Sequence, residues 1–313
     1  MLEAGDYAEI DLLKTELSRR WSAVGTTQFV RAVAGELDAI RMKGSMKSRN
    51  IVPVLCVVAF APLLAHDLYV MPDRFILKPG QDLIVELHNG DAFPDSEGPP
   101  ARERLHGTRI LGNKGPIELK DFHEAHKGLA TRVPIGEIGS GSFIITASLS
   151  ANSRKYESAK FQAYLEDEGL TMVSKYRAAH REQDQPVTEL YSKYAKGLIV
   201  YGTPSRFSTQ PVGLTIEIIP DIDPATLKAG ASMPVHVLFE GRPLAGLTIE
   251  TTWTTGAPGK PSVVGITDSK GQLAIPLQTG KCRITTGYSQ RYRDQSVANW
   301  ETFFATLTFE VSR

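Results

Sequence analysis

Apolar and polar residues alternate along most of the chain that follows residue 65. In Leu83–His88, the side chains of Leu83, Val85 and Leu87 fall on one face and polar side chains fall on the other. This period of two is typical of a half-buried antiparallel strand. The same pattern recurs in Ser142–Ser150, Gly213–Ile219, Met233–Phe239, Leu247–Trp253, Leu273–Leu277, Lys281–Thr286 and Phe303–Val311. Short strands separated by turns predict a mainly β protein built from β-sandwiches.

One stretch departs from this period. Between Lys160 and Gly197, apolar residues occur at helical spacing in two groups, which are separated by the polar segment His180–Pro186. The first group is Phe161, Tyr164 and Leu165, and the second is Leu190, Tyr191 and Tyr194. We therefore expect two helices that join two sandwiches. The predicted domains are an N-terminal sandwich over 66–159, a helical linker over 160–205 and a C-terminal sandwich over 206–313.

The C-terminal part contains two predicted hairpin turns. Glu240–Pro243 separates two strand-like runs, and Asp268–Gly271 separates the next two. Glycine, proline and aspartate at these positions favour tight turns. This arrangement resembles the transthyretin-like or carboxypeptidase-regulatory module, so both sandwiches are expected to be of the Ig-like or transthyretin-like kind. A fold of this kind does not by itself specify a function.

The segment before residue 66 has the three parts of a secretory signal. Met46–Arg49 is basic, Ile51–Leu64 is apolar, and Ala65 is a small residue suited to cleavage. The apolar run is about 14 residues, shorter than the roughly 20 that span a bilayer as a helix. We therefore predict a signal peptide over 46–65, export to the periplasm and a mature chain that begins at His66. Residues 1–45 are polar and of mixed charge, so either translation starts at Met46 or these residues form a cytoplasmic extension.

Composition excludes several classes of function. The chain has 35 Lys and Arg residues against 35 Asp and Glu residues, so it lacks the net positive charge that would favour binding to nucleic acid. Cys56 lies within the predicted signal, which leaves Cys282 without a disulfide partner. The sequence has no phosphate-binding Gly-Lys-Ser/Thr loop and no Gly-x-Ser-x-Gly nucleophile motif. We predict that the protein is not an enzyme.

The most informative histidine is His66. At a mature N-terminus, its α-amine and its Nδ1 atom can bind one metal ion together, a donor pair that suits nickel, cobalt or copper. Asp67 is expected to add an oxygen ligand or to orient the imidazole. His88 and Asp91 complete the predicted site, because the first strand should pair beside them. The alternative is that His66 caps this strand and that His88 is a solvent-facing strand residue.

Two further segments contain groups that can bind metals. His123 and His126 have the spacing His-x-x-His, which places both side chains on one face if the segment is helical. An exposed loop is the alternative. Asp91, Asp95 and Glu97 form a turn with three carboxylates, which could bind a harder ion such as calcium, although the twelve-residue calcium-binding pattern is absent.

Several segments, in order, resemble an exported family described as the periplasmic component of cobalt and nickel transport, the NikM-like proteins. They are Ala65–Leu83, Asn89–Glu97, Lys160–Leu170, Glu189–Ile199, Leu238–Gly246, Thr267–Leu277 and Asn299–Val311. The resemblance implies a non-catalytic accessory protein that holds a divalent transition metal and delivers it to a membrane transporter. Two alternatives remain open: an exported module that binds a protein or glycan without metal, and a copper oxidase in which His66 and a second histidine hold the metal.

Overall fold

The computed structural model describes residues 66–80 and 82–312. The predicted signal peptide and residues 1–45 lie outside this range. Ala65–Arg313 forms one compact unit, and it is mainly β, as predicted. Its helices are α4 (Ile135–Ile138), α5 (Ser158–Asp167) and α6 (Thr171–Ala179), with short 3-10 turns at Arg102–Arg104, Arg206–Thr209 and Pro224–Thr226. Among the described residues, no helix is long and apolar enough to cross a membrane.

Three sheets make up this unit. The N-terminal sheet has the order β1 (Leu68–Pro72), β3 (Leu83–Asn89), β7 (Gly128–Val133) and β6 (His123–Ala125). The C-terminal sheet contains β10 (Ile216–Pro220), β11 (Ser232–Phe239), β12 (Arg242–Pro243) and β15 (Gln272–Pro276). The nine-stranded long sheet contains β14 (Ser262–Ile266), β13 (Thr248–Thr254), β16 (Gly280–Arg291), β17 (Trp300–Val311), β9 (Val187–Tyr201), β8 (Gly141–Tyr156), β4 (Leu105–Leu111), β5 (Ile117–Glu118) and β2 (Ile76–Leu77).

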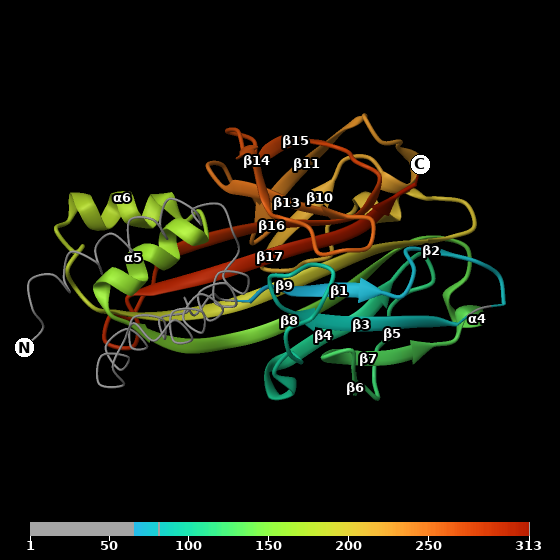
Figure 1. Cartoon of the computed structure of the whole chain (residues 1–313), viewed down its shortest axis with the longest axis horizontal. Coiled ribbons are helices and arrows are strands. Elements are labelled where there is room, and N and C mark those ends of the chain that lie inside the picture. Colours follow the sequence, from blue (N-terminus) through green and yellow to red (C-terminus); the bar gives the residue numbers. More distant parts are fainter. Residues whose placement is uncertain (1–65, 81, 313) are drawn as a thin grey trace, which may run out of the picture. The chain divides into compact units, whose positions relative to one another are not determined.

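The central strands β9 and β17 of the long sheet are largely buried on both faces. Figure 1 shows the N-terminal and C-terminal sheets on opposite sides of the long strands β8, β9 and β17. On β9, Ala195 and Ile199 belong to the core under the N-terminal sheet, whereas Leu198 belongs to the core under the C-terminal sheet. The two predicted sandwiches therefore share one central sheet, and its strands contribute residues to both cores, such as Ile144 of β8 and Leu198 of β9 to the core under the C-terminal sheet.

The predicted helical linker is correct only in its first part. α5 contains Phe161, Tyr164 and Leu165 on its buried side, as expected. The second predicted helix, around Leu190 and Tyr194, is instead the strand β9, which pairs with β8 and β17. A central strand covered on both faces loses the simple alternation of an exposed one, and this allowed its residues to be mistaken for a helix.

The hairpin predicted around Glu240 also needs a correction. The tight turn exists: Glu240 and Gly241 both have positive φ, and Phe239 pairs with Arg242 across it. This geometry is the two-residue hairpin turn that matches strand twist. The returning strand β12 is short, however, and the next strand, β13, pairs in the long sheet rather than with β11. The chain therefore crosses from one layer to the other after Pro243.

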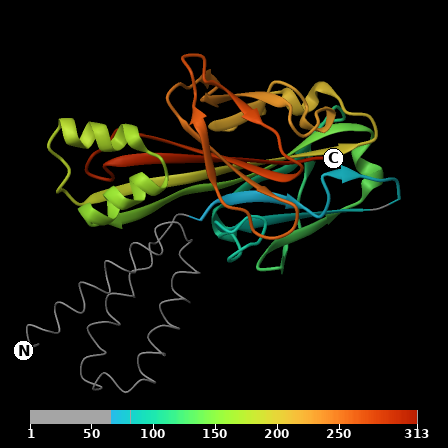
Figure 2. The same ribbon diagram turned by 45° about the horizontal axis from the view of Figure 1, so that its top comes forward.

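The helices α5 and α6 cover one end of the long strands, as both Figure 1 and Figure 2 show. Their apolar residues form a third core with Tyr156, Val187, Trp300 and Phe304 of the long sheet. On β9, Glu189 contacts Tyr164 of α5, and Lys193, four residues later, contacts the segment that leads into β1. The start of the N-terminal sheet thus lies beside the helix pair on the same face of β9.

Candidate functional site

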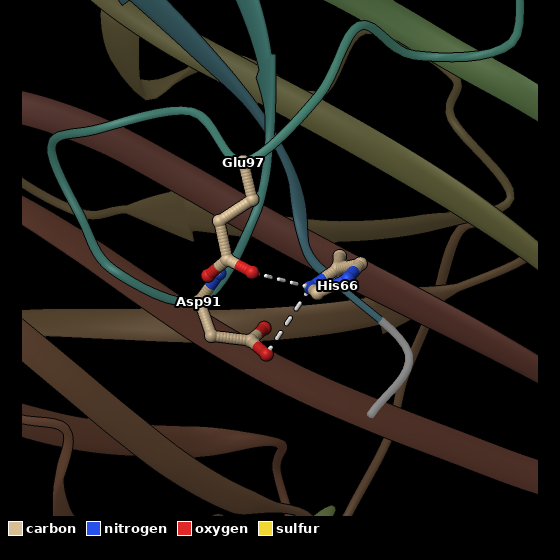
Figure 3. Close-up of side chains that lie close together, drawn as sticks. All are labelled: His66, Asp91 and Glu97. Atoms are coloured by element: carbon tan, nitrogen blue, oxygen red, sulfur yellow. Dashed lines mark hydrogen bonds and ion pairs between the residues drawn. The ribbon is translucent and has the colours of Figure 1, made fainter. Parts of the chain in front are cut away.

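Three side chains from two segments meet just before β1 (Figure 3). His66 Nδ1 lies 3.3 Å from Asp91 Oδ2 and 3.4 Å from Glu97 Oε2. The three atoms all lie within 4.8 Å of one another, and among the described residues this is the group of side chains that could hold a metal ion. The sequence predicted His66 and Asp91 as partners. It placed Glu97 only in a separate oxygen-rich turn.

The environment of His66 Nδ1 is unusual for an imidazole beside two carboxylates. The imidazole is 42% exposed, yet its Nδ1 atom is inaccessible to solvent and makes no hydrogen bond. A charge-assisted hydrogen bond would bring nitrogen and oxygen to about 2.7–2.9 Å. Two ligands bound to one metal at about 2.0–2.2 Å lie roughly 2.8–3.1 Å apart at an octahedral right angle and roughly 3.3–3.6 Å apart at a tetrahedral angle. The distances around Nδ1 match the tetrahedral spacing.

The position of His66 is fixed by the free edge of β1. The carbonyl of Asp67 accepts a hydrogen bond from Gly90 of the neighbouring segment, so alternate carbonyls point away from β3. Side chains of the long sheet bind these outward carbonyls in succession: Lys193 binds that of His66, Thr306 that of Leu68 and Thr308 that of Val70. All three of these donor side chains are buried. These hydrogen bonds satisfy the carbonyls of an otherwise unpaired strand edge. The bond from Lys193 also fixes the backbone of His66 against the long sheet.

The loop that carries Asp91 and Glu97 is held at several points. Glu97 Oε1 accepts hydrogen bonds from the backbone N–H groups of Asp91 (3.0 Å) and Ala92 (3.3 Å), which leaves Oε2 facing His66. The Tyr69 hydroxyl donates to the carbonyl of Asp95 at 2.6 Å. The buried Ser96 hydroxyl donates to the carbonyls of Gly98 and Lys127. The two carboxylates are therefore held in place by the hydrogen bonds of their own loop.

Asp67 lies beside this group without joining it. Its Oδ2 atom is 3.3 Å from the guanidinium of Arg283 and 3.5 Å from the Thr285 hydroxyl. Arg283 also donates to the carbonyls of Gly90 and Asp91. It therefore connects Asp67 to the loop Asp91–Glu97, which is named the ligand loop below. Asp67 is therefore not placed as the direct ligand that was expected. Its negative charge instead acts on the neighbouring carboxylates.

The electrostatics of the site are set by burial and by clustered carboxylates. Burial is the main cause that raises the pKa of Asp91 above its ordinary value, and the negative charge of the nearby Asp67 carboxylate adds to the increase. Burial is also the main cause that raises the pKa of Glu168, at the end of α5, well above its ordinary value, and the charges of Asp67 and Asp91 add to it. Burial lowers the pKa of Lys193, although the same carboxylates oppose this shift. A bound cation would relieve this repulsion among the carboxylates.

The other predicted ligands lie apart from the group. His88 is buried and contacts Glu86 and the carbonyl of Pro94 instead of facing His66, so Glu97 takes the place expected for His88. His123 is exposed on β6. His126 follows β6 at a positive φ and contacts Glu86. The segment is a strand and a turn rather than a helix, so the expected His-x-x-His pair does not form.

The fold and the site define a mainly β protein with a histidine–carboxylate group at the start of its first strand. Residues 63–288 match a family described as a domain of unknown function, DUF4198, and the chain belongs to this family. No curated protein matches the chain.

Two solved structures share a weak likeness with the chain. One contains the three N-terminal domains of the highly immunogenic outer capsid protein Hoc of bacteriophage RB49, with 10% identity, a TM-score of 0.18 and coverage of 78% of this chain. The other is the adhesin InvE of Yersinia pseudotuberculosis, with 13% identity, a TM-score of 0.19 and coverage of 79%. The chain spans 59% of the length of each of these structures.

Proposed function

We propose that this protein binds a divalent transition-metal ion through His66 Nδ1, Asp91 Oδ2 and Glu97 Oε2. The observation that supports this proposal is the approach of two carboxylate oxygens, at 3.3 and 3.4 Å, to a solvent-inaccessible imidazole nitrogen that makes no hydrogen bond. In this proposal the ion is cargo that the protein carries, and it takes no part in a catalysed reaction. The protein is an exported accessory that carries the ion to a membrane importer, in keeping with its resemblance to the NikM-like family.

The donor set selects the kind of ion. One imidazole and two carboxylates suit borderline divalent ions such as nickel and cobalt, and imidazole also suits copper(II). A soft copper(I) ion prefers sulfur, but Cys282 is buried far along the chain in β16, and burial raises the pKa of its thiol well above its ordinary value. In a chain that begins at His66, the α-amine supplies a further nitrogen. This amine closes a chelate ring with Nδ1, the same atom that faces the carboxylates.

Delivery requires that the ion can leave. His66, Asp91 and Glu97 have 42%, 36% and 39% of their side-chain surface exposed, so an incoming ligand can reach the ion from one side. On the other side, the buried side chains of Lys193 and Arg283 in the long sheet bind the carbonyls of His66 and Asp91. This combination supports ligand exchange with a partner without unfolding of the carrier. Because the ligands must be deprotonated, uptake is favoured at neutral pH and release is favoured in acid.

The test is calorimetric titration with nickel, cobalt and copper(II), using the full chain and the chain that begins at His66. We expect one ion per chain, tighter binding when His66 is the first residue, and at least a tenfold loss, about 1.4 kcal/mol, in Asp91→Asn. The matched control is His123→Ala, which removes an exposed imidazole outside the site and should leave the affinity unchanged.

Other outcomes lead to the alternatives. A correctly processed chain that takes up no ion would contradict the proposal and favour an exported module that binds a protein or glycan. A chain that binds copper and consumes reductant and oxygen over many cycles would favour the oxidase. An equal loss of binding in His123→Ala and Asp91→Asn would place the ion elsewhere.

A further inference from the structure

A second ionisable group lies behind the ligand loop. The Glu86 carboxylate contacts two histidines: its Oε2 is 2.7 Å from His88 Nε2 and its Oε1 is 2.8 Å from His126 Nδ1. The His88 side chain is buried and that of Glu86 is 12% exposed, whereas the His126 side chain is 80% exposed. Burial alone would raise the pKa of Glu86, but the hydrogen bonds from the two histidines outweigh it and lower this pKa. Glu86 is therefore an ionised acceptor.

His88 joins this carboxylate to the ligand loop. Its second nitrogen, Nδ1, lies 3.0 Å from the carbonyl oxygen of Pro94. A carbonyl and a carboxylate can only accept, so both ring nitrogens of His88 serve as donors. The ring is locked further by an edge-on contact with Tyr69, whose hydroxyl binds the next loop carbonyl, that of Asp95. Pro94 itself lies midway between the ligands Asp91 and Glu97.

We propose that His88 is a positioning residue for the metal site, which it supports by holding the Asp91–Glu97 loop through the Pro94 carbonyl. This inference rests on the proposed function. His88 never touches the ion. Glu86 fixes the ring so that Nδ1 faces Pro94, and thereby keeps Asp91 and Glu97 at the separation that the ion requires. Groups that orient a metal site from behind typically change its affinity by about 10–100-fold.

Two substitutions separate this role from simple packing. In His88→Asn, the side-chain amide nitrogen takes the place of Nδ1 and can still donate to Pro94. In His88→Gln, the amide reaches the place of Nε2 and Glu86, but it no longer supports the loop. Both variants lose the buried ring, so both should lose thermal stability to a similar extent. Only the Gln variant should lose the hydrogen bond that positions the ligands.

The variants are compared in the full chain by nickel titration, thermal unfolding and hydrogen exchange of two loop amides. These amides are Phe93 N–H, bonded to the carbonyl of Asp91, and Asp95 N–H, bonded to that of Ala92. We expect nickel affinity to fall about 10–100-fold in His88→Gln and less than about threefold in His88→Asn. Exchange of both amides should accelerate in the Gln variant only.

Equal affinities in the two variants, with unchanged loop exchange, would overturn the positioning role. Equal losses in both variants, in step with their loss of stability, would overturn it as well, because packing alone would explain them. If the wild-type chain binds no nickel, cobalt or copper, the proposed function fails, and loop exchange still decides whether His88 holds the loop. Faster exchange in His88→Gln alone would then support the structural part of the inference.

Discussion

Lys196 is a lysine in the interior of the protein. It lies on β9 between Tyr194 and Leu198, which belong to the core under the C-terminal sheet, and it is 1% exposed. Its Nζ atom has no hydrogen-bond partner among the described residues. Burial lowers the pKa of Lys196 to about 8, and the carboxylate of Glu217 opposes this shift only in part. Glu217 is itself engaged by the backbone N–H groups of Val212 and Leu214.

The energetic consequence follows from the change in pKa on folding. Between pH 8 and 10.5, the unfolded chain holds a proton on Lys196 that the folded chain has released, so stability rises with pH in this range. At pH 7, the shift of about 2.5 units corresponds to roughly 3 kcal/mol of lost stability. Lys196→Met keeps a long side chain of similar shape and removes the charge. We therefore expect the free energy of unfolding to increase by about 2–3 kcal/mol at pH 7.

The assay is urea unfolding of both proteins at pH 7 and pH 9.5. The variant should be more stable by about 2–3 kcal/mol at pH 7. This gain should be smaller by about 2 kcal/mol at pH 9.5, where Lys196 in the folded wild-type chain has mostly lost its proton. At neutral pH, this gain should raise Tm by about 4–10 °C for a unit of this size. Lys175→Met, which makes the same chemical change at an exposed position of α6, is the control and should stay within about 0.5 kcal/mol of wild type.

Two results would refute this reasoning. A loss of stability in Lys196→Met at pH 7 would mean that the ammonium group is bound to Glu217 and that its removal leaves a buried carboxylate without its partner. A gain that does not depend on pH would mean that Met simply packs better than Lys. Only a gain that shrinks between pH 7 and 9.5 identifies desolvation of the ammonium group as the cause.

Three further predictions test other buried groups. Burial raises the pKa of Glu189 to about 7, so stability should fall by about 3 kcal/mol between pH 4.5 and 8, and urea unfolding of Glu189→Gln should not show this fall. Lys193→Met removes the donor to the His66 carbonyl, so calorimetry should show about tenfold weaker nickel binding; unchanged affinity would count against this anchor. Thr308→Val leaves the buried Val70 carbonyl without its 2.6 Å bond and should cost about 1–3 kcal/mol in urea unfolding; a neutral effect would mean that the strand edge needs no such donor.

The strands that the sequence predicted well are those with one clearly apolar face. The prediction for Leu83–His88 matches β3, and those for Met233–Phe239 and Phe303–Val311 match β11 and the larger part of β17. The pairing expected between the first strand and the neighbourhood of His88 is confirmed, since Tyr69 lies opposite His88. In each case, the alternation arises from one element and needs no knowledge of distant neighbours.

β9 could not be predicted in this way because its polar residues are explained only by partners that are far away in the sequence. Glu189 is bound by the hydroxyls of Tyr164 and Thr302, and Lys193 is bound by the carbonyl of His66. Taken alone, a buried glutamate and a buried lysine interrupt the apolar pattern of a central strand. With their partners present, they fit within it. Local periodicity therefore gave the wrong element at the centre of the fold.

The candidate site shows the same limit of sequence-based prediction: its residue types were recognised, but their full arrangement in space was not. Asp91 and Glu97 are close in sequence, and their turn was recognised as rich in carboxylates, but the pattern of residue types does not indicate which oxygen of Glu97 faces His66. That choice depends on Glu97 Oε1 binding two loop amides, which leaves Oε2 for His66. The position of the His66 backbone depends in turn on a hydrogen bond from Lys193, which is 127 residues away in the sequence. The sequence can name residues able to bind a metal, whereas the long sheet decides which of them meet.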